Sequence, residues 1–332
     1  MIPVKTAWWT RTCNIAKAVT LPLLMSLAGN AQLQAPPHSG SQPSEHYRVS
    51  VDVNLVVLQA AVLDRQGRAA SDLREQDFEI YEDGVRQTIR LFRHDDIPVT
   101  VGLVVDHSGS MRPKITEVIL AARTFVQSSS PDDEMFVVNF NEHVSLGLPL
   151  TTPLSNSPEE LARAIGDTPA TGKTALYDAV VRAQTQLQTG TRDRKVLLVI
   201  SDGGDNASRH TLDDVLKGNA KSRALVYAVG VFDPTDPDRN PAVLRRMSEP
   251  TGGQAFFPRE LSEVVAICER IARDIRNQYT LGYFSSNPPG PAAFRVIKVS
   301  ARANGKSKLF VRTRSGYLAD RESRAVIRDD AK

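Results

Sequence analysis

Apolar and polar residues alternate along the first part of the chain, from about residue 47 to residue 93. The alternation runs over Val49–Val57 and Phe78–Tyr81, and it resumes at Ile89–Phe92 after the turn residues Glu82-Asp83-Gly84. A period of two residues is typical of strands with one buried face. The pattern therefore predicts a small antiparallel sheet with a hairpin.

Near-continuous apolar runs replace this alternation from residue 98 onward. They lie at Val99–Val105, Met135–Phe140, Val196–Ile200 and Leu225–Val231. The segments between them repeat apolar residues at helical spacing, as in Ile115–Val126 and Leu176–Leu187. Strands that are apolar throughout are buried on both faces, so we expect a mostly parallel sheet covered by helices. Val144–Leu150 is expected to add a short antiparallel edge strand.

A helical pattern over residues 260–277 is followed by strand patterns at residues 279–284, 294–301 and 308–313. The strand segments on either side of the α/β block are too short to bury much apolar surface alone, so we expect them to pair. The predicted fold is α/β: a doubly wound, mostly parallel sheet with a small flanking β-sandwich built from the N- and C-terminal segments. The boundaries are 47–97 for the N-terminal β segment, 98–278 for the α/β domain, 279–319 for the C-terminal β segment and 320–332 for a charged tail.

Residues 1–31 have the layout of a secretory signal peptide, with basic residues first, an apolar stretch at 18–28, and small residues before a cleavage site near Ala31. The apolar stretch is shorter than the roughly 20 residues that span a bilayer, so we expect no stable membrane insertion after cleavage. Residues 32–46 are rich in Gln, Pro and Ser and are expected to form a linker. The alternative is a buried N-terminal helix. The signal peptide favours a periplasmic or secreted protein.

Composition and charge narrow the class of protein. With 41% hydrophobic and 24% charged residues, the chain is of ordinary globular type, neither disordered nor collagen-like. The net charge of +3 comes from Lys5, Arg11 and Lys17 in the predicted signal peptide, so the remainder carries as many acids as bases. It has no basic stripe, and nucleic-acid binding is not expected. Without Cys13 only Cys268 remains, on the apolar face of the last predicted helix, where it is expected to pack as a small hydrophobe.

Oxygen-bearing side chains lie where predicted strands end. Asp106, Ser108 and Ser110 follow the run Val99–Val105, Asp202 follows Val196–Ile200, and Thr174 precedes a predicted helix. In an open parallel sheet, ligands bind beyond the carboxyl ends of the strands. We therefore expect these five side chains to form one metal site. Each residue alone would also fit a helix cap or a turn.

The donor set points to a hard cation. Carboxylate and hydroxyl oxygens without Cys or His select Mg²⁺, with Mn²⁺ and Ca²⁺ as alternatives. Two carboxylates only balance the charge of a divalent ion, and the hydroxyl groups add none. The ion would therefore keep an electrophilic face, and an acidic group of a protein partner would complete its shell.

These motifs resemble a known family. Asp106-x-Ser108-x-Ser110-Met111, Thr174 in Thr-Ala-Leu-Tyr-Asp-Ala, and Ser201-Asp202-Gly203 are similar to the metal-ion-dependent adhesion site of von Willebrand factor type A domains, over about residues 98–277. The flank Asp77–Gly84, together with Gly316-Tyr317, resembles the bacterial von Willebrand factor A-related proteins common in acidobacteria.

The resemblance implies a binding function without catalysis. It implies direct coordination by Ser108, Ser110 and Thr174 or a subset, with Asp106 and Asp202 acting partly through water. It also implies a hypothesis that the last helix, residues 260–277, slides when the metal shell rearranges.

Lys173 departs from the family pattern, which has a small residue just before the threonine. A cation beside a divalent ion is repulsive and would weaken metal binding unless the side chain turns outward. The nearby acids Asp178 and Asp205 could compensate, although each also fits a helix first turn or a loop.

Other functions fit the sequence less well. Gly172-Lys173-Thr174 resembles the end of a P-loop, but five residues rather than four separate Gly166 from Gly172, and a helical pattern precedes this segment where a P-loop needs a strand. A haloacid dehalogenase-type phosphatase would need an acid where Ser108 stands. A serine hydrolase would need a GxSxG elbow around Ser108. A metal-free scaffold, in which the sandwich makes the contacts, is the remaining alternative.

Overall fold

The computed structural model describes residues 55–232, 239–287, 293–302 and 308–319. The strands within these ranges are β1 Leu55–Leu63, β2 Phe78–Glu82, β3 Val85–Gln87, β4 Ile89–Arg93, β5 Val99–Asp106, β6 Glu134–Phe140, β7 Val144–Leu146, β8 Arg194–Ser201, β9 Leu225–Gly230, β10 Ala255–Phe256, β11 Gln278–Phe284, β12 Ala293–Ala301, β13 Phe310–Arg312 and β14 Gly316–Ala319. The helices are α1 Ile115–Gln127, α2 Pro158–Gly166, α3 Leu176–Leu187, α4 Leu212–Ser222, α5 Pro241–Ser248 and α6 Glu263–Arg276. The signal peptide, the linker, the strand residues Val49–Val53 and the charged tail predicted above lie outside the described residues.

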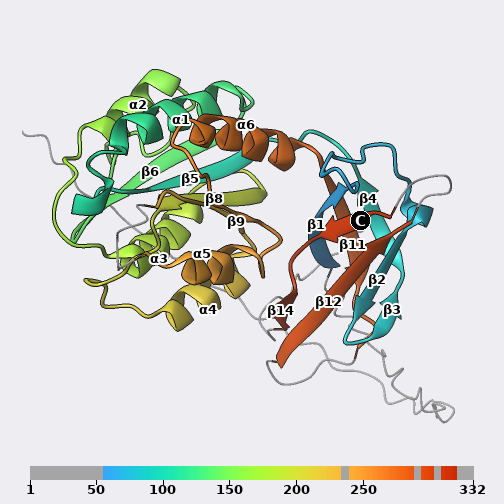
Figure 1. The fold of residues 1–332 in the computed structure, drawn as a ribbon. Coiled ribbons are helices and arrows are strands. Elements are labelled where there is room, and N and C mark those ends of the chain that lie inside the picture. The colour runs from blue at the N-terminus through green and yellow to red at the C-terminus, as the bar shows by residue number, and fades with distance from the viewer. Residues whose placement is uncertain (1–54, 233–238, 288–292, 303–307, 320–332) are drawn as a thin grey trace, which may run out of the picture. The chain divides into compact units, whose positions relative to one another are not determined.

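The α/β part is built on a six-stranded sheet with the order β10-β9-β8-β5-β6-β7. Its strands are parallel except for β7, which pairs antiparallel with β6. Helices α1, α2 and α6 cover one face, and α3, α4 and α5 cover the other (Figure 1). This confirms the predicted doubly wound sheet and its short antiparallel edge strand.

Burial on both faces explains why the strands are apolar throughout. Every residue of β5 is buried, and its alternate side chains enter two separate cores. Leu103 packs with α1 and α6 on one side, whereas Val104 packs with α3 on the other. Cys268 of α6 is fully buried in the first core, as expected, and burial raises the pKa of its thiol to about 12.

Two four-stranded sheets form the sandwich, with the orders β13-β1-β11-β4 and β14-β12-β2-β3. Strands from before and after the α/β part alternate within them: β1 pairs with β11 over seven residue pairs, and β2 pairs with β12 over five. Leu58 and Tyr279 from one sheet meet Ile80 and Val299 from the other in a third core. The predicted sandwich built from both ends of the chain is therefore confirmed.

The N-terminal β segment differs from the prediction in one respect. The hairpin at Asp83-Gly84 joins β2 to β3 as expected, but the chain then passes to the other sheet. Thr88 separates β3, which pairs with β2, from β4, which pairs with β11. The prediction of a single antiparallel sheet for residues 47–93 is thus wrong. Its strands are divided between two sheets, and each sheet is completed by strands from the C-terminal segment.

Polar contacts join the sandwich to the α/β part. Only Asn277 separates α6 from β11. The buried guanidinium of Arg194 donates to the carbonyl of Ile275 (3.0 Å) and to Oγ1 of Thr280 (3.2 Å). Arg312 of β13 pairs with Asp274 of α6. Across the described ranges, no helix is both long and apolar enough to cross a membrane.

Candidate metal site

The candidate site lies where the strand order of the central sheet reverses. From β5 the chain passes to β6 on one side and returns to β8 on the other, so β5 and β8 are parallel neighbours. Asp106 is the last residue of β5, and Asp202 directly follows β8. Such a switch point is the usual ligand site of open α/β sheets. Both aspartates are buried at the carboxyl edge of the sheet.

Hydrogen bonds connect four of the five predicted residues. The hydroxyls of Ser108 and Ser110 are 3.1 Å apart, and Ser110 donates to Oδ2 of Asp202 (2.6 Å). Oδ1 of Asp106 accepts from the N–H of Ser108 (2.8 Å), while its Oδ2 accepts from the hydroxyl of Ser201 (2.6 Å). The turn after β5 therefore brings its two serines against the end of β8.

Thr174 reaches the same edge through main-chain contacts. The loop before α3 binds the turn after β5, because Thr171 N–H donates to His107 O (2.8 Å) and Gly109 N–H donates to Gly172 O (3.0 Å). Thr174 itself is buried, and its N–H donates to Oδ1 of Asn206 (2.9 Å). In return, the N–H of Asn206 donates to the carbonyl of Thr174 (2.9 Å). All five predicted residues thus lie in one cluster of loops.

The electrostatics of Asp106 are those of a carboxylate in need of a cation. Burial and, to a smaller extent, the nearby charge of Asp202 raise its pKa to about 7, although the hydrogen bonds from Ser201 and Ser108 act in the opposite direction. Two carboxylates in a site closed to water repel each other unless a positive group lies between them. The donor set contains no Lys or Arg to do this, so a metal ion fits the charge of the site.

The donors also fit a hard ion rather than a soft one. Within the part of the chain that the structure describes, no group of three or more His, Cys, Asp or Glu residues could hold a metal. The site instead offers two carboxylates and three hydroxyls, the oxygen chemistry that Mg²⁺ and Mn²⁺ accept.

Lys173 does not enter this cluster. Its side chain is exposed, and its N–H donates to the carboxylate of Glu142 (2.8 Å) in the β6–β7 turn. Gly172 has a φ of +79°, and a Cβ there would meet the Glu142 carboxylate at 1.7 Å, so a glycine is needed for this contact. The acids expected to compensate are engaged in holding loops: Asp178 accepts from His210 and Asp205 accepts from Ser208.

Three residues of the site were missed by the sequence analysis. Ser201 was part of the quoted motif but had no role, and neither Asn206 nor Glu142 was assigned one. Their contacts with Asp106, Thr174 and Lys173 join segments 31 to 95 residues apart. A single sequence carries no signal for such pairings.

The surroundings of Thr174 differ from those of a P-loop. The segment Gly172-Lys173-Thr174 follows α2 and an irregular stretch, not a strand. Its N–H groups are also engaged, since those of Lys173 and Thr174 donate to Glu142 and Asn206. They are therefore not free to surround a phosphate, which is how a P-loop binds its nucleotide.

Comparison with known proteins gives one family and several structures of similar fold. The model of the von Willebrand factor type A domain matches residues 100–270. No curated protein matches the chain. Among solved structures, a von Willebrand factor type A protein from Catenulispora acidiphila has 13% identity and a TM-score of 0.49, over 81% of this chain and 72% of that one.

Two further solved structures cover mainly the α/β part. Proximal thread matrix protein 1 from the mussel byssus, described with a zinc-occupied MIDAS motif, has 15% identity and a TM-score of 0.45, over 55% of this chain and 48% of that one. The von Willebrand factor domain of the type V pili tip protein Mfa5 from Porphyromonas gingivalis has 12% identity and a TM-score of 0.41, over 54% and 95%. This chain spans about half the length of the mussel protein.

Proposed function

The chain belongs to the von Willebrand factor type A domain family, whose members are generally interaction or adhesion modules, and we propose that it binds a protein partner through a divalent cation. Domains of this family often hold such an ion at a metal-ion-dependent adhesion site. The proposal assigns that site to Asp106, Ser108, Ser110, Thr174 and Asp202. Mg²⁺ is the proposed ion, with Mn²⁺ and Ca²⁺ as alternatives.

One observation carries this proposal: two buried aspartates, Asp106 and Asp202, lie close enough to repel each other, and none of the five proposed donors is a Lys or Arg. Ser110 already binds Asp202, and Ser108 contacts Ser110, so the hydroxyls are directed toward the carboxylates rather than toward solvent. Each oxygen of the Asp106 carboxylate accepts a hydrogen bond, one from the N–H of Ser108 and the other from the hydroxyl of Ser201. These bonds fix the positions of the anionic groups before an ion arrives, which lowers the entropy lost on binding.

The bound ion would supply a positive centre for an anionic group. Two carboxylates balance the charge of a divalent ion, and neutral hydroxyl ligands add no further negative charge. The ion would therefore keep an electrophilic position open to a further acidic group. We propose that a carboxylate of the partner takes this position. Nothing in the donor set offers a nucleophile with its own base, so we propose no catalysis.

We also propose that the protein is exported, because residues 1–31 have the layout of a signal peptide. An adhesion module outside the cytoplasm would meet the surfaces of other cells and proteins. The periplasm and the medium are both compatible with this proposal.

Calorimetric titration of Mg²⁺ and Mn²⁺ into metal-stripped protein tests the site. The expected result is saturable binding that Asp106→Ala and Thr174→Ala each abolish. Two matched controls remove the same groups elsewhere: Asp213→Ala, an exposed acid paired with Lys217, and Thr185→Ala, an exposed hydroxyl on α3. Both should bind as the wild type does. Absence of binding in the wild type would contradict the proposal and favour a metal-free scaffold.

The partner's carboxylate is tested with a random peptide library that carries one fixed Asp. Peptides should be retained with Mg²⁺ and released by a chelator, and the same library with Asn in place of Asp should not be retained. Equal retention of the two libraries would show that the ion does not capture an acidic group.

A further inference from the structure

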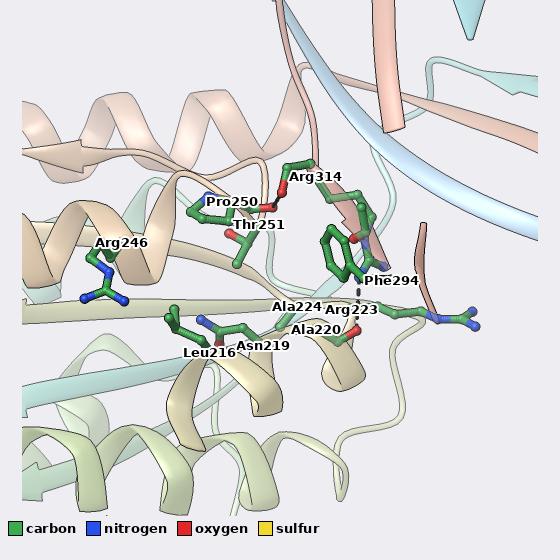
Figure 2. Close-up of a pocket in the computed structure, with 12 residues that line it drawn as sticks. Leu216, Asn219, Ala220, Arg223, Ala224, Arg246, Pro250, Thr251, Phe294 and Arg314 are labelled. Atoms are coloured by element: carbon green, nitrogen blue, oxygen red, sulfur yellow. Dashed lines mark hydrogen bonds between the residues drawn. The ribbon is translucent and has the colours of Figure 1, made fainter. Parts of the chain in front are cut away.

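A second cavity lies far from the metal site, where the sandwich meets the α/β part. It has a volume of about 240 Å³ and is lined by α4, the end of α5 with the turn after it, β12 and the residues around β14 (Figure 2). Its walls are mainly apolar and come from Leu216, Ala220, Ala224, Pro250 and Phe294. The charged residues that line it are arginines, and no described Asp or Glu does so.

Arg314 lines one end of this cavity. Its Nε donates to the carbonyl of Gly316 (2.9 Å) and one Nη donates to the carbonyl of Ala220 (3.1 Å). Both acceptors are neutral, and no described carboxylate pairs with the guanidinium. Burial and, to a smaller extent, the charge of Arg223 lower the pKa of Arg314 to about 10. The second Nη has no partner among the described residues, so the group retains donors and an unbalanced charge.

Two other arginines lie at the margins. Figure 2 shows Arg246 at the end of the cavity opposite Arg314, while the Arg223 side chain extends away from it. Neither forms an ion pair within the described ranges. Arg223 has a left-handed backbone with a φ of 55°, a conformation uncommon for a residue with a side chain. Because arginines lie toward both ends of the cavity, its electrostatic potential is positive.

The remaining polar side chains are already used by the fold. Asn219 donates to Met247 O (2.9 Å) and accepts from Gln184 (2.8 Å). Thr251 donates to Ser248 O (2.6 Å) and accepts from the N–H of Val226 (2.9 Å). A ligand would consequently find apolar walls and guanidinium donors, but no neutral polar group in need of a partner.

We propose that this cavity binds a small organic carboxylate, an anion with an apolar body, through Arg314 and with support from Arg246. A planar carboxylate matches the donor geometry of a guanidinium, and a bond between opposite charges away from water is stronger than one between neutral groups. The apolar body would fill the space between Phe294 and the α4 residues. Inorganic phosphate fits less well, because it has no apolar surface and its double charge needs more donors.

Fluorine NMR of 4-fluorobenzoate with the full chain tests this proposal. A chelator is present throughout, so the result does not depend on the metal site or on the proposed adhesion function. We expect saturable binding with a dissociation constant on the order of 1 mM or below, as for a ligand of this size. The neutral counterpart 4-fluorobenzamide should bind at least about tenfold more weakly, because it cannot form the charged bond.

Variants locate the site. Arg314→Gln should weaken 4-fluorobenzoate binding at least about tenfold. Because Arg314 also binds Ala220, circular dichroism must show that this variant folds; Arg246→Gln, which loses no hydrogen bond seen in the structure, gives a second test with a smaller decrease. Arg245→Gln is the matched control, since Arg245 is its neighbour but pairs with Glu249 and lies outside the cavity. Equal binding of acid and amide, no binding of the acid, or an equal loss in Arg245→Gln would overturn the proposal.

Discussion

Asn206 holds the peptide of Thr174 by two reciprocal hydrogen bonds. Its side-chain oxygen accepts from the N–H of Thr174, and its own N–H donates to the carbonyl of the same residue. The second bond belongs to the main chain and survives substitution, whereas the first does not. Asn206 therefore fixes the orientation of Thr174 without being one of the proposed ligands, and we regard it as a positioning residue.

We expect Asn206→Ala to weaken Mg²⁺ binding by about tenfold, because a lost hydrogen bond to a buried N–H costs on the order of 1 to 2 kcal/mol. Asn206→Asp keeps an acceptor oxygen and should restore most of the affinity. Calorimetry gives the affinity, and urea unfolding of the metal-free protein gives the stability. A merely structural role would lower stability in the Ala variant and leave the affinity of the folded fraction unchanged.

For single residues, the sequence indicated which side chains would lie together at the carboxyl edge of the sheet, but not which residues hold them there. Asp106, Ser108, Ser110 and Asp202 could be found because each follows a recognisable strand, and parallel strands end at one edge. Asn206 could not, because its role depends on the path of the loop after β8, which no periodic pattern records. The outward position of Lys173 was likewise open, since it depends on the contact with Glu142.

Among the elements, β2 ends in a carboxylate that links the two sheets of the sandwich. Glu82 is fully buried and accepts from the hydroxyls of Tyr283 in β11 (2.7 Å) and Tyr317 in β14 (3.1 Å). Ser285 (2.5 Å) and Asn287 (2.8 Å) bind its other oxygen. Burial alone would raise the pKa of Glu82, but these donors outweigh it and hold the pKa below its ordinary value.

The lowered pKa gives the sandwich a defined dependence on pH. A carboxyl group whose pKa is lower in the folded than in the unfolded protein stabilises the fold above its unfolded pKa, near 4.5, and loses this effect as the pH falls through the folded pKa. We therefore expect Glu82→Gln to be less stable than the wild type at pH 7, with a difference that shrinks below pH 4.5. Urea unfolding at several pH values measures this.

Glu79→Gln is the control, since Glu79 lies on the same strand, faces its other side and pairs with Arg86. Its stability difference from the wild type should remain small at every pH. A Glu82→Gln difference that stays constant between pH 7 and pH 3 would contradict the account of Glu82 as a charged link.

The number of residues in an element decides whether its apolar period can be recognised in the sequence. The long apolar strands β5, β6, β8 and β9 and the helix α6 have enough residues to show their period. β10 has two residues and β14 has four, too few for any period to appear. The passage from β3 to β4 escaped prediction for another reason: the alternation continues across Thr88, so a change of sheet leaves the pattern intact.

For the whole molecule, the order of segments makes the sandwich depend on the α/β part. The strands β1–β4 precede that part and β11–β14 follow it, so residues 94–277 form a single loop between the halves of the sandwich. While the α/β part is folded, its ends lie together, as the pairing of β4 with β11 requires. Closing an unfolded loop of this length costs roughly 5 kcal/mol. Typical net stabilities are about 5 to 15 kcal/mol, so the sandwich would lose much of its stability.

We expect the sandwich to depend on the folding of the α/β part, whereas the α/β part should fold without the sandwich. We expect Leu198→Ala, in the core around β8, to destabilise both parts, and Ile80→Ala, in β2, to destabilise mainly the sandwich; each removes a fully buried side chain and costs about 2 to 5 kcal/mol. Hydrogen exchange in increasing urea separates the two, with β1 reporting on the sandwich and β5 on the α/β part. In Leu198→Ala the two strands should lose protection together, because the sandwich cannot close over an unfolded loop. In Ile80→Ala, β1 should lose protection first while β5 keeps it, and persistent protection of β1 after β5 has exchanged would show that the sandwich folds without its insertion.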